Sequence, residues 1–296
     1  MLRPQSNIRR LLIDLTGLWS IKKDGSSNDF VPIAVPGSWN EQYQEFLYEE
    51  GKMIYKKSFH IPKEFEEKNI RLYFEAVNSR SEIYLNGDKV GENEIGYLPF
   101  EIDITKMVNF GETNKLEVIV ENTLRKDSFP AGNTPQEDLL IGTSDRRPST
   151  NFDFLNYGGI IRPVTIEIAN KETIQDIRVD TSHSSPDNKK GIINFKVLTN
   201  VEDKRKIEIV IDGKKYHKVI DNGKANFEIE IEQAKFWDLE NPNLYEVEVN
   251  LMKGEQILDT YTLKIGIRTI SWDNKDLYIN NKPIKLKGFG KHEEFP

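Results

Sequence analysis

The alternation of apolar and polar residues along this chain is the feature that most limits its fold. Residues 115–120, 206–211 and 227–231 each place an apolar side chain at every second position. Successive side chains of a strand point to opposite faces of a sheet, so this period of two is typical of half-buried strands. Runs with the period of a helix are few and short. The sequence therefore predicts a mainly β protein.

Turn residues between the alternating segments predict hairpins. Asn86-Gly87 stands between two apolar arms, the strongest short hairpin signal in a sequence, and Asp212-Gly213 and Lys253-Gly254 repeat the pattern. The spacing after residue 172 is that of a small antiparallel sandwich. We expect three parts: a first sandwich at 1–172, a second sandwich at 173–272, and a remainder at 273–296.

One short segment has helical spacing. Trp39, Tyr43, Phe46 and Leu47 fall on one face of a helix, which predicts a short helix laid against a sheet. The chain has four tryptophans, Trp19, Trp39, Trp237 and Trp272, each beside an apolar stripe. Aromatic faces also stack on sugars, but this position favours packing in the core for all four.

The last residues look like the beginning of a further domain. Ile284 and Leu286 alternate with lysines, and Gly288 and Gly290 then allow a turn before His292. The first strand of a (β/α)₈ barrel has this form, and the carboxyl ends of barrel strands carry the chemistry. We expect the chain to stop inside an incomplete barrel, with His292 facing a substrate.

Composition excludes several classes of function. The 296 residues carry a net charge of −7 and a pI near 5.4, which argues against a nucleic-acid or anionic-membrane surface. There is no cysteine, so disulfides and thiolate chemistry are excluded. The first residues lack the apolar core of a signal peptide, and a cytoplasmic protein is expected. Small molecules or protein chains are the expected partners.

Several side chains are candidates for a site on their residue types alone. Asp153 lies between two phenylalanines; it either caps its own turn or accepts hydrogen bonds from sugar hydroxyls, and the residues alone favour the cap. His60, His183 and His217 lack the spacing of metal ligands. No phosphate-binding loop or nucleophile elbow is present. We therefore expect neither a cofactor nor a metal.

The order of its motifs makes the chain resemble the amino-terminal portion of a family 2 glycoside hydrolase, most like a bacterial β-glucuronidase. The motifs are Leu15-Thr-Gly17-Leu-Trp19, Val35-Pro-Gly-Ser-Trp-Asn40, Tyr55-Lys-Lys-Ser-Phe59, Asn86-Gly87, Gly96-Tyr-Leu-Pro-Phe100, Phe152-Asp-Phe-Leu-Asn-Tyr-Gly-Gly159, Phe236-Trp237 through Leu244-Tyr245, Gly266-Ile-Arg268 and Gly288-Phe-Gly-Lys-His-Glu293. The resemblance implies a jelly-roll (galactose-binding-like) sandwich, an immunoglobulin-like sandwich and the first strand of a barrel.

The resemblance also implies an activity and a set of site residues. Members of this kind are retaining exo-enzymes that hydrolyse terminal β-D-glucuronides with two glutamates on later barrel strands, which this chain lacks. The adjacent Glu293 and Glu294 point to opposite faces if the strand continues, so they are no catalytic pair. The resemblance makes Asp153 and His292 substrate-binding residues, with Glu293 as a weaker candidate. The chain alone is expected to be inactive, and the complete protein to be a homo-oligomer.

Two alternatives stay open at this stage. The chain could be a stand-alone carbohydrate-binding or assembly module, because jelly rolls serve many functions. It could also be the same portion of a β-galactosidase. The incomplete barrel strand favours the glycosidase fragment over the binding module.

Overall fold

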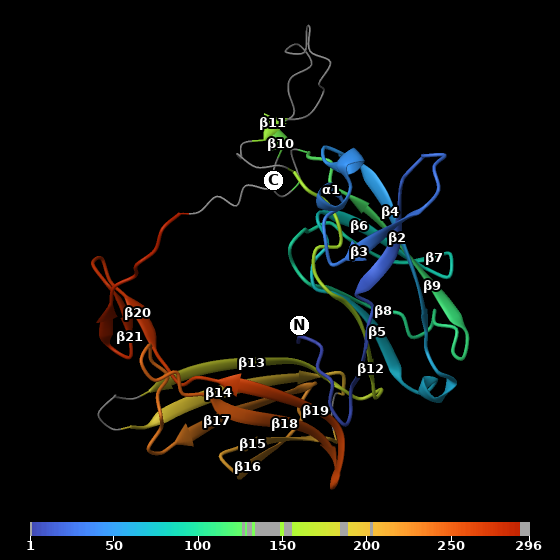
Figure 1. The fold of residues 1–296 in the computed structure, drawn as a ribbon. Coiled ribbons are helices and arrows are strands. Elements are labelled where there is room, and N and C mark those ends of the chain that lie inside the picture. Colours follow the sequence, from blue (N-terminus) through green and yellow to red (C-terminus); the bar gives the residue numbers. More distant parts are fainter. Residues whose placement is uncertain are drawn as a thin grey trace. The chain divides into compact units, whose positions relative to one another are not determined.

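The computed structural model describes residues 2–125, 128, 132–133, 149–150, 156–183, 189–201 and 204–290. They divide into two compact units (Figure 1). Each unit has its own hydrophobic core. We call residues 12–168 the first sandwich, and residues 2–11 together with 169–290 the second sandwich. The amino-terminal segment therefore belongs to the unit formed by the later part of the chain.

The first sandwich consists of two sheets. One sheet has the order β1-β12-β5-β8 and the other β3-β2-β4-β9-β6-β7. Their strands are β1 (Leu11–Asp14), β2 (Gly17–Lys23), β3 (Val31–Val35), β4 (Lys52–His60), β5 (Asn69–Phe74), β6 (Arg80–Leu85), β7 (Asp88–Asn93), β8 (Phe100–Asp103), β9 (Thr113–Glu121) and β12 (Val164–Ala169). The predicted hairpin is confirmed, since Asn86 and Gly87 join β6 to β7 with φ values of 54° and 98°.

The core of the first sandwich lies between its two sheets. Phe74 and Ile166 reach it from the smaller sheet, and Tyr55 and Val118 from the larger one. Along β9 the apolar residues at every second position are buried while their neighbours are more exposed. The alternation seen in the sequence thus becomes the division between core and solvent.

The predicted helix is split into two short pieces. α1 (Trp39–Gln42) is followed by the 3-10 helix η1 (Gln44–Phe46), because Tyr43 between them is extended, with φ −137° and ψ 129°. The Tyr43 hydroxyl donates to the Pro32 carbonyl, and its ring packs against Phe46 at 5.5 Å between centroids. A second 3-10 turn, η2 (Lys63–Phe65), follows β4. The helical spacing was real, but tertiary contacts of Tyr43 interrupt the helix.

The second sandwich also pairs two antiparallel sheets, with the orders β13-β14-β17 and β16-β15-β18-β19. Their strands are β13 (Ile174–His183), β14 (Gly191–Thr199), β15 (Lys206–Ile211), β16 (Lys214–Val219), β17 (Lys224–Ile231), β18 (Tyr245–Lys253) and β19 (Gln256–Ile265). Phe195 and Ile229 from one sheet meet Ile209 and Val249 from the other in a single core. β13 and β19 are edge strands of their sheets.

Two small sheets complete the described structure. β10 (Gly132–Asn133) pairs with β11 (Ser149–Thr150), and β20 (Ile270–Trp272), β21 (Leu277–Ile279) and β22 (Lys282–Ile284) form a three-stranded sheet. The first barrel strand expected from Ile284 onward is not confirmed, because β22 ends at Ile284 and Leu286 is 76% exposed. Within the described ranges, the structure contains no helix long and apolar enough to cross a bilayer.

The tryptophans differ in their surroundings. Trp19 and Trp39 are buried in the first core, as predicted. Trp237 is half-buried, with the Arg268 guanidinium 5.1 Å from its ring centroid. Core packing was wrong for Trp272, which is 77% exposed on the edge strand β20. β20 is a three-residue strand with a single neighbouring strand, and all three of its residues are exposed.

Candidate functional site

The three predicted site residues lie outside the described part of the chain. Asp153, His292 and Glu293 fall in ranges that the structure does not describe, so their positions relative to one another stay predictions. The described structure resumes at Asn156, three residues after Asp153. Residues 156–160, which we call the loop stem, are the nearest described part of the candidate site, and they belong to the first sandwich.

Backbone hydrogen bonds hold the loop stem on both sides. Gly159 and Asn78 form an antiparallel bridge, in which the Asn78 N–H donates to the Gly159 carbonyl at 2.8 Å and the Gly159 N–H donates back at 2.9 Å. On the other side, the Trp39 N–H donates to the Gly158 carbonyl at 3.1 Å, and the Gly37 N–H donates to the Ile160 carbonyl at 2.9 Å. The stem is therefore paired like a central strand, although only Gly159 forms a formal bridge.

Asn40 joins the stem to the loop after α1. Its side chain is 1% exposed; Oδ1 accepts from the Gly158 N–H at 2.9 Å, and Nδ2 donates to the carbonyls of Phe46 at 2.9 Å and Leu47 at 3.2 Å. A buried amide that bonds to a donor of one segment and to acceptors of another is costly to remove, because each group left without a partner costs about 1–3 kcal/mol. Asn40 thus holds the stem in one position.

Two further asparagines tie the stem to its neighbours. The Asn78 Nδ2 donates to the Tyr157 carbonyl at 2.6 Å. Asn122, also 1% exposed, accepts at Oδ1 from the Gly51 N–H at 2.9 Å, and its backbone carbonyl accepts from Asn156 Nδ2 at 2.7 Å. These contacts make the stem a rigid end of the loop that carries Asp153 in the sequence.

The stem packs so closely that it requires glycine twice. A Cβ atom on Gly158 would lie 2.2 Å from Cη2 of Trp39 and 2.7 Å from Cβ of Asn122. Gly159 has a φ of +147°, and a Cβ there would lie 2.5 Å from the Gly37 carbonyl oxygen. Contacts below 3.0 Å with a buried ring or with backbone force a displacement, so the Gly158-Gly159 pair is needed for the close approach.

Two tyrosines contact each other at the stem. Tyr97 packs edge-on against Tyr157, with ring centroids 6.3 Å apart. Burial raises the pKa of the Tyr97 hydroxyl, the Tyr157 hydroxyl adds to the rise, and Asn78 opposes it. The hydroxyl is therefore a neutral hydrogen-bond donor near neutral pH. On the loop that carries Tyr97, Ile95 and Leu98 are 55% and 57% exposed.

The described part of the site contains no catalytic pair, and its asparagine amides are buried and bonded to backbone groups. Only the tyrosine side chains remain as groups that suit the hydroxyls and apolar faces of a sugar. In the described ranges, no cluster of three or more histidine, aspartate or glutamate side chains could hold a metal ion. His183 Nε2 instead lies 2.8 Å from Thr269 Oγ1, and burial lowers the pKa of its imidazole.

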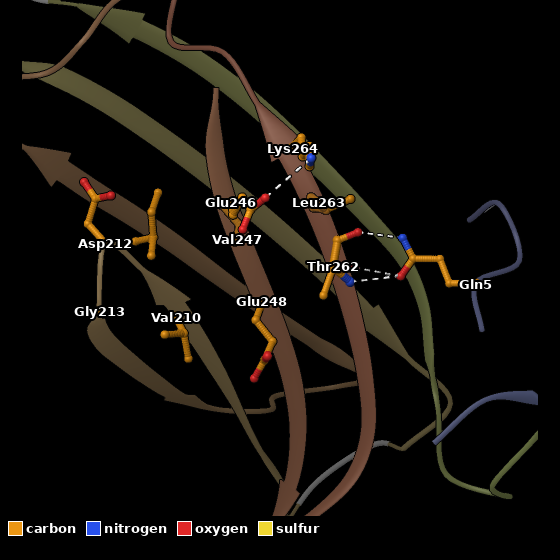
Figure 2. A pocket seen from close by; sticks show the side chains of 11 residues that line it. Gln5, Val210, Asp212, Gly213, Glu246, Val247, Glu248, Thr262, Leu263 and Lys264 are labelled. Atoms are coloured by element: carbon orange, nitrogen blue, oxygen red, sulfur yellow. Dashed lines mark hydrogen bonds and ion pairs between the residues drawn. The ribbon is translucent and has the colours of Figure 1, made fainter. Parts of the chain in front are cut away.

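Surface hollows elsewhere have the charge pattern of ordinary solvated faces. A hollow of about 230 Å³ beside the start of β6 is lined by Lys52, Glu82, Glu121 and Arg125 among others, and Arg125 pairs with Glu121 at 2.6 Å. The larger hollow drawn in Figure 2, of about 560 Å³, lies on β15, β18 and β19. Its Lys264 and Glu246 form an exposed pair at 3.4 Å. Exposed pairs of this kind contribute little binding or stability.

Sequence reasoning did not identify the asparagines that support the stem. Asn40 was noticed only as the last residue of a Val-Pro-Gly-Ser-Trp-Asn motif, and Asn78 and Asn122 carried no signal. The sequence signal that was available is the Gly158-Gly159 pair. Two adjacent glycines predict that another segment packs closely against the backbone, but they do not indicate which segment. Those partners lie 79 residues away for the Tyr157–Asn78 contact and 118 residues away for Gly158–Asn40.

Comparisons with known proteins cover almost the whole chain. Residues 21–169 match the family model "Glycosyl hydrolases family 2, sugar binding domain", and residues 172–268 match the model "Glycosyl hydrolases family 2". The chain is 30% identical to a β-glucuronidase of Streptococcus agalactiae over 99% of its own length and 50% of the relative. It is also 30% identical to a β-galactosidase of Thermoanaerobacter pseudethanolicus, over 93% of the chain and 36% of the relative.

Solved structures show the same pattern. A β-D-glucuronidase of Dictyoglomus thermophilum superimposes with a TM-score of 0.86 and 34% identity, over 99% of this chain and 50% of the other. A β-glucuronidase of Bifidobacterium dentium, complexed with coumarin-3-O-glucuronide, gives a TM-score of 0.87 at 29% identity, over 99% and 54%. The chain thus spans about half the length of the β-glucuronidases that it matches.

Proposed function

The chain belongs to family 2 of the glycosyl hydrolases, and on that premise we propose that it is the amino-terminal portion of a retaining exo-β-glucuronidase that hydrolyses terminal β-D-glucuronides. The observation that carries the proposal is similarity over 99% of the chain to proteins named β-glucuronidase, both in sequence and in structure. The mainly β fold with two sandwich units agrees with the two family models matched in order.

The proposal divides the work between this chain and the rest of the enzyme. Retaining hydrolysis requires two carboxyl groups about 5–5.5 Å apart, one as nucleophile and one as general acid and then base. Both are proposed to lie outside this chain, in a barrel that begins within residues 273–296. Residues 1–172 and 173–272 are the proposed jelly-roll and immunoglobulin-like domains that support it.

Asp153 is the proposed contribution of the first sandwich to the sugar pocket. Its carboxylate would accept hydrogen bonds from hydroxyls of the terminal sugar that do not react, which orients the sugar and excludes internal residues of a chain. The loop stem supports this role, because a loop with one end held by Asn40, Asn78 and Asn122 loses less entropy when it orders around a ligand. His292 is proposed to hydrogen-bond the same sugar, and Glu293 to brace its neighbours.

Turnover by the complete protein tests the proposal. The protein encoded by the complete reading frame should hydrolyse 4-nitrophenyl β-D-glucuronide with retention of anomeric configuration, which NMR of the first-formed product detects. This chain by itself should show no turnover. Robust turnover by the purified chain, with contaminating complete enzyme excluded, would contradict the division of labour, and an inactive complete protein would contradict the activity.

A β-galactosidase is the second candidate, because one also matches at 30% identity over 93% of the chain. The two substrates differ in the charge at the sugar's sixth carbon and in the configuration at the fourth, and a site built for the carboxylate rejects a neutral analogue strongly. We expect kcat/KM for the glucuronide to exceed that for the matching galactoside by at least about 100-fold. The reverse ratio would establish the galactosidase.

A stand-alone binding module predicts a different measurement. Calorimetric titration of this chain with glucuronic acid should give at most weak binding, with a Kd above about 1 mM, if the pocket is completed elsewhere. Micromolar binding would favour the module.

We also propose a cytoplasmic location and a homo-oligomer of the complete protein; cell fractionation and sedimentation of that protein test the two points.

A further inference from the structure

The amino-terminal segment of the chain lies along the outer edge of β19. Figure 2 shows Gln5 reaching from this segment to Thr262, with its side-chain amide facing the strand. Gln5 Nε2 donates to the Thr262 carbonyl at 2.7 Å, and Gln5 Oε1 accepts from the Thr262 N–H at 3.0 Å. A side-chain amide here makes the donor and acceptor pair that a neighbouring strand would otherwise supply.

The same arrangement continues along the strand. Thr260 and Thr262 lie opposite Asn250 and Glu248 of β18. The Thr260 carbonyl accepts from Asn7 Nδ2 at 3.0 Å, and the Thr260 N–H donates to Asp259 Oδ1 at 2.9 Å. All four backbone groups of these two threonines are therefore bonded to side chains.

A third amide extends the pattern by two residues. Asn170 Nδ2 donates to the Leu258 carbonyl, so the carbonyls of residues 258, 260 and 262 each accept from a side-chain amide. Alternate residues of a strand direct their backbone groups to the same side, so the bonded groups of Thr260 and Thr262 are successive outward ones, which are free in a bare edge strand. Leu258 lies where the pairing of β18 and β19 shifts register.

Arg10 anchors the segment at the seam between the two sheets. Its side chain is 3% exposed and donates to both carboxylate oxygens of Asp259, at 2.9 and 2.7 Å. Nη2 also donates to the Ile174 carbonyl at 2.8 Å, at the start of the other edge strand, β13. The Tyr261 hydroxyl donates to the Arg3 carbonyl at 2.8 Å. The segment is thus bound at both ends and in the middle.

An exposed strand edge is a template for pairing with another chain, and proteins cover such edges. We propose that the outer edge of β19 is a strand-pairing surface whose occupant is the chain's own amino-terminal segment, residues 3–10, and that this occupancy keeps the edge from pairing with a second copy of the chain. The surface presents carbonyl acceptors and an amide donor, which the segment meets with side-chain amides and a second copy would meet with extended backbone. The inference is independent of the glycosidase proposal.

The test removes the amides and leaves the anchor in place. The double variant Gln5→Ala/Asn7→Ala of the whole chain keeps Arg10 and its partners, and Asn226→Ala/Gln256→Ala, which removes two exposed amides of the same unit, is the control. Amide hydrogen exchange at Thr262 should become at least about fivefold faster in the first variant, since one hydrogen bond is worth about 1 kcal/mol. Sedimentation velocity at rising concentration should show an average mass above that of the unaltered chain.

Addition in trans separates the proposal from loss of folding. In the triple variant that also carries Arg10→Ala, the buried site of the Arg10 side chain is vacant. There, a synthetic peptide of residues 1–11 should restore both the protection of Thr262 and the lower mass, whereas the same peptide with Arg10→Ala should not. Unchanged exchange at Thr262, or a mass equal to that of the control at every concentration, overturns the proposal. Increased mass that the peptide does not reverse also overturns it, because association would then proceed through another surface.

Discussion

Arg10 is the side chain whose loss should destabilise the second sandwich most clearly. It is 3% exposed and Asp259 is 1% exposed, and their ion pair at 2.7 Å is held by two further donors, the N–H groups of Ile174 and Thr260. Arg10→Met keeps much of the side-chain volume but leaves the Asp259 carboxylate buried without its counter-charge. Removing one partner of a buried ion pair costs about 3–5 kcal/mol.

Because the N–H groups of Ile174 and Thr260 still donate to the Asp259 carboxylate, we expect Arg10→Met to lower the free energy of unfolding by about 3 kcal/mol, at the lower end of that range. For a unit of this size the melting temperature should fall by roughly 9–12 °C. The double variant Arg10→Met/Asp259→Leu removes both charges but leaves the N–H groups of Ile174 and Thr260 without acceptors, at about 1–3 kcal/mol each. We expect the double variant to lose less than the sum of the single variants, by at least about 1 kcal/mol.

Differential scanning calorimetry of the whole chain measures the loss, and hydrogen exchange of β14 and β18 assigns the affected transition to the second sandwich. Lys264→Met is the control, since its pair with Glu246 is 68% and 82% exposed and should be worth less than about 1 kcal/mol. If Arg10→Met costs no more than the control, or if the losses in the double-mutant cycle simply add, the argument from buried charge is refuted.

Three other predictions concern the loop stem, the proposed sugar contact and acid stability. Asn40→Ala should destabilise the first sandwich by about 2–4 kcal/mol, because the Gly158 N–H and several carbonyls lose their partner; a urea midpoint equal to that of the unaltered chain would contradict it. Asp153→Ala in the complete enzyme should lower kcat/KM by about 10- to 100-fold at an unchanged melting temperature, and Asp153→Asn by less; near-normal kinetics would return Asp153 to a loop cap. The Arg205 side chain, through its hydrogen bonds, holds the pKa of Glu172 below its ordinary value of 4.5. This contribution to the free energy of unfolding is present above pH 4.5 and is lost as the pH falls through the lower pKa of folded Glu172. Below pH 4.5, the melting temperature of Glu172→Gln should therefore fall less steeply with pH than that of the unaltered chain; two curves of equal slope would contradict the prediction.

Local chemistry in the sequence was sufficient for the strands and the tight turns. The alternation in residues 115–120, 206–211 and 227–231 predicted β9, β15 and β17, and Asn86-Gly87 and Asp212-Gly213 predicted two hairpins. Asn86 and Asp212 adopt the positive φ values of 54° and 48° that such turns require. These features depend on neighbouring residues only, because both the pleat of a strand and the handedness of a turn are set within a few residues.

The partners that lie far apart in the chain were decided by the tertiary structure alone. Arg10 and Asp259 are separated by 249 residues, and no periodicity marks either of them as half of a buried pair. The asparagines that support the loop stem also have no sequence pattern that marks them as buried, since an amide in a loop forms the same turn whether or not it is buried. Trp39 and Trp272 both border apolar residues in sequence, yet one is 0% and the other 77% exposed. A sequence pattern specifies which face of an element is apolar, whereas burial depends on which other element covers that face.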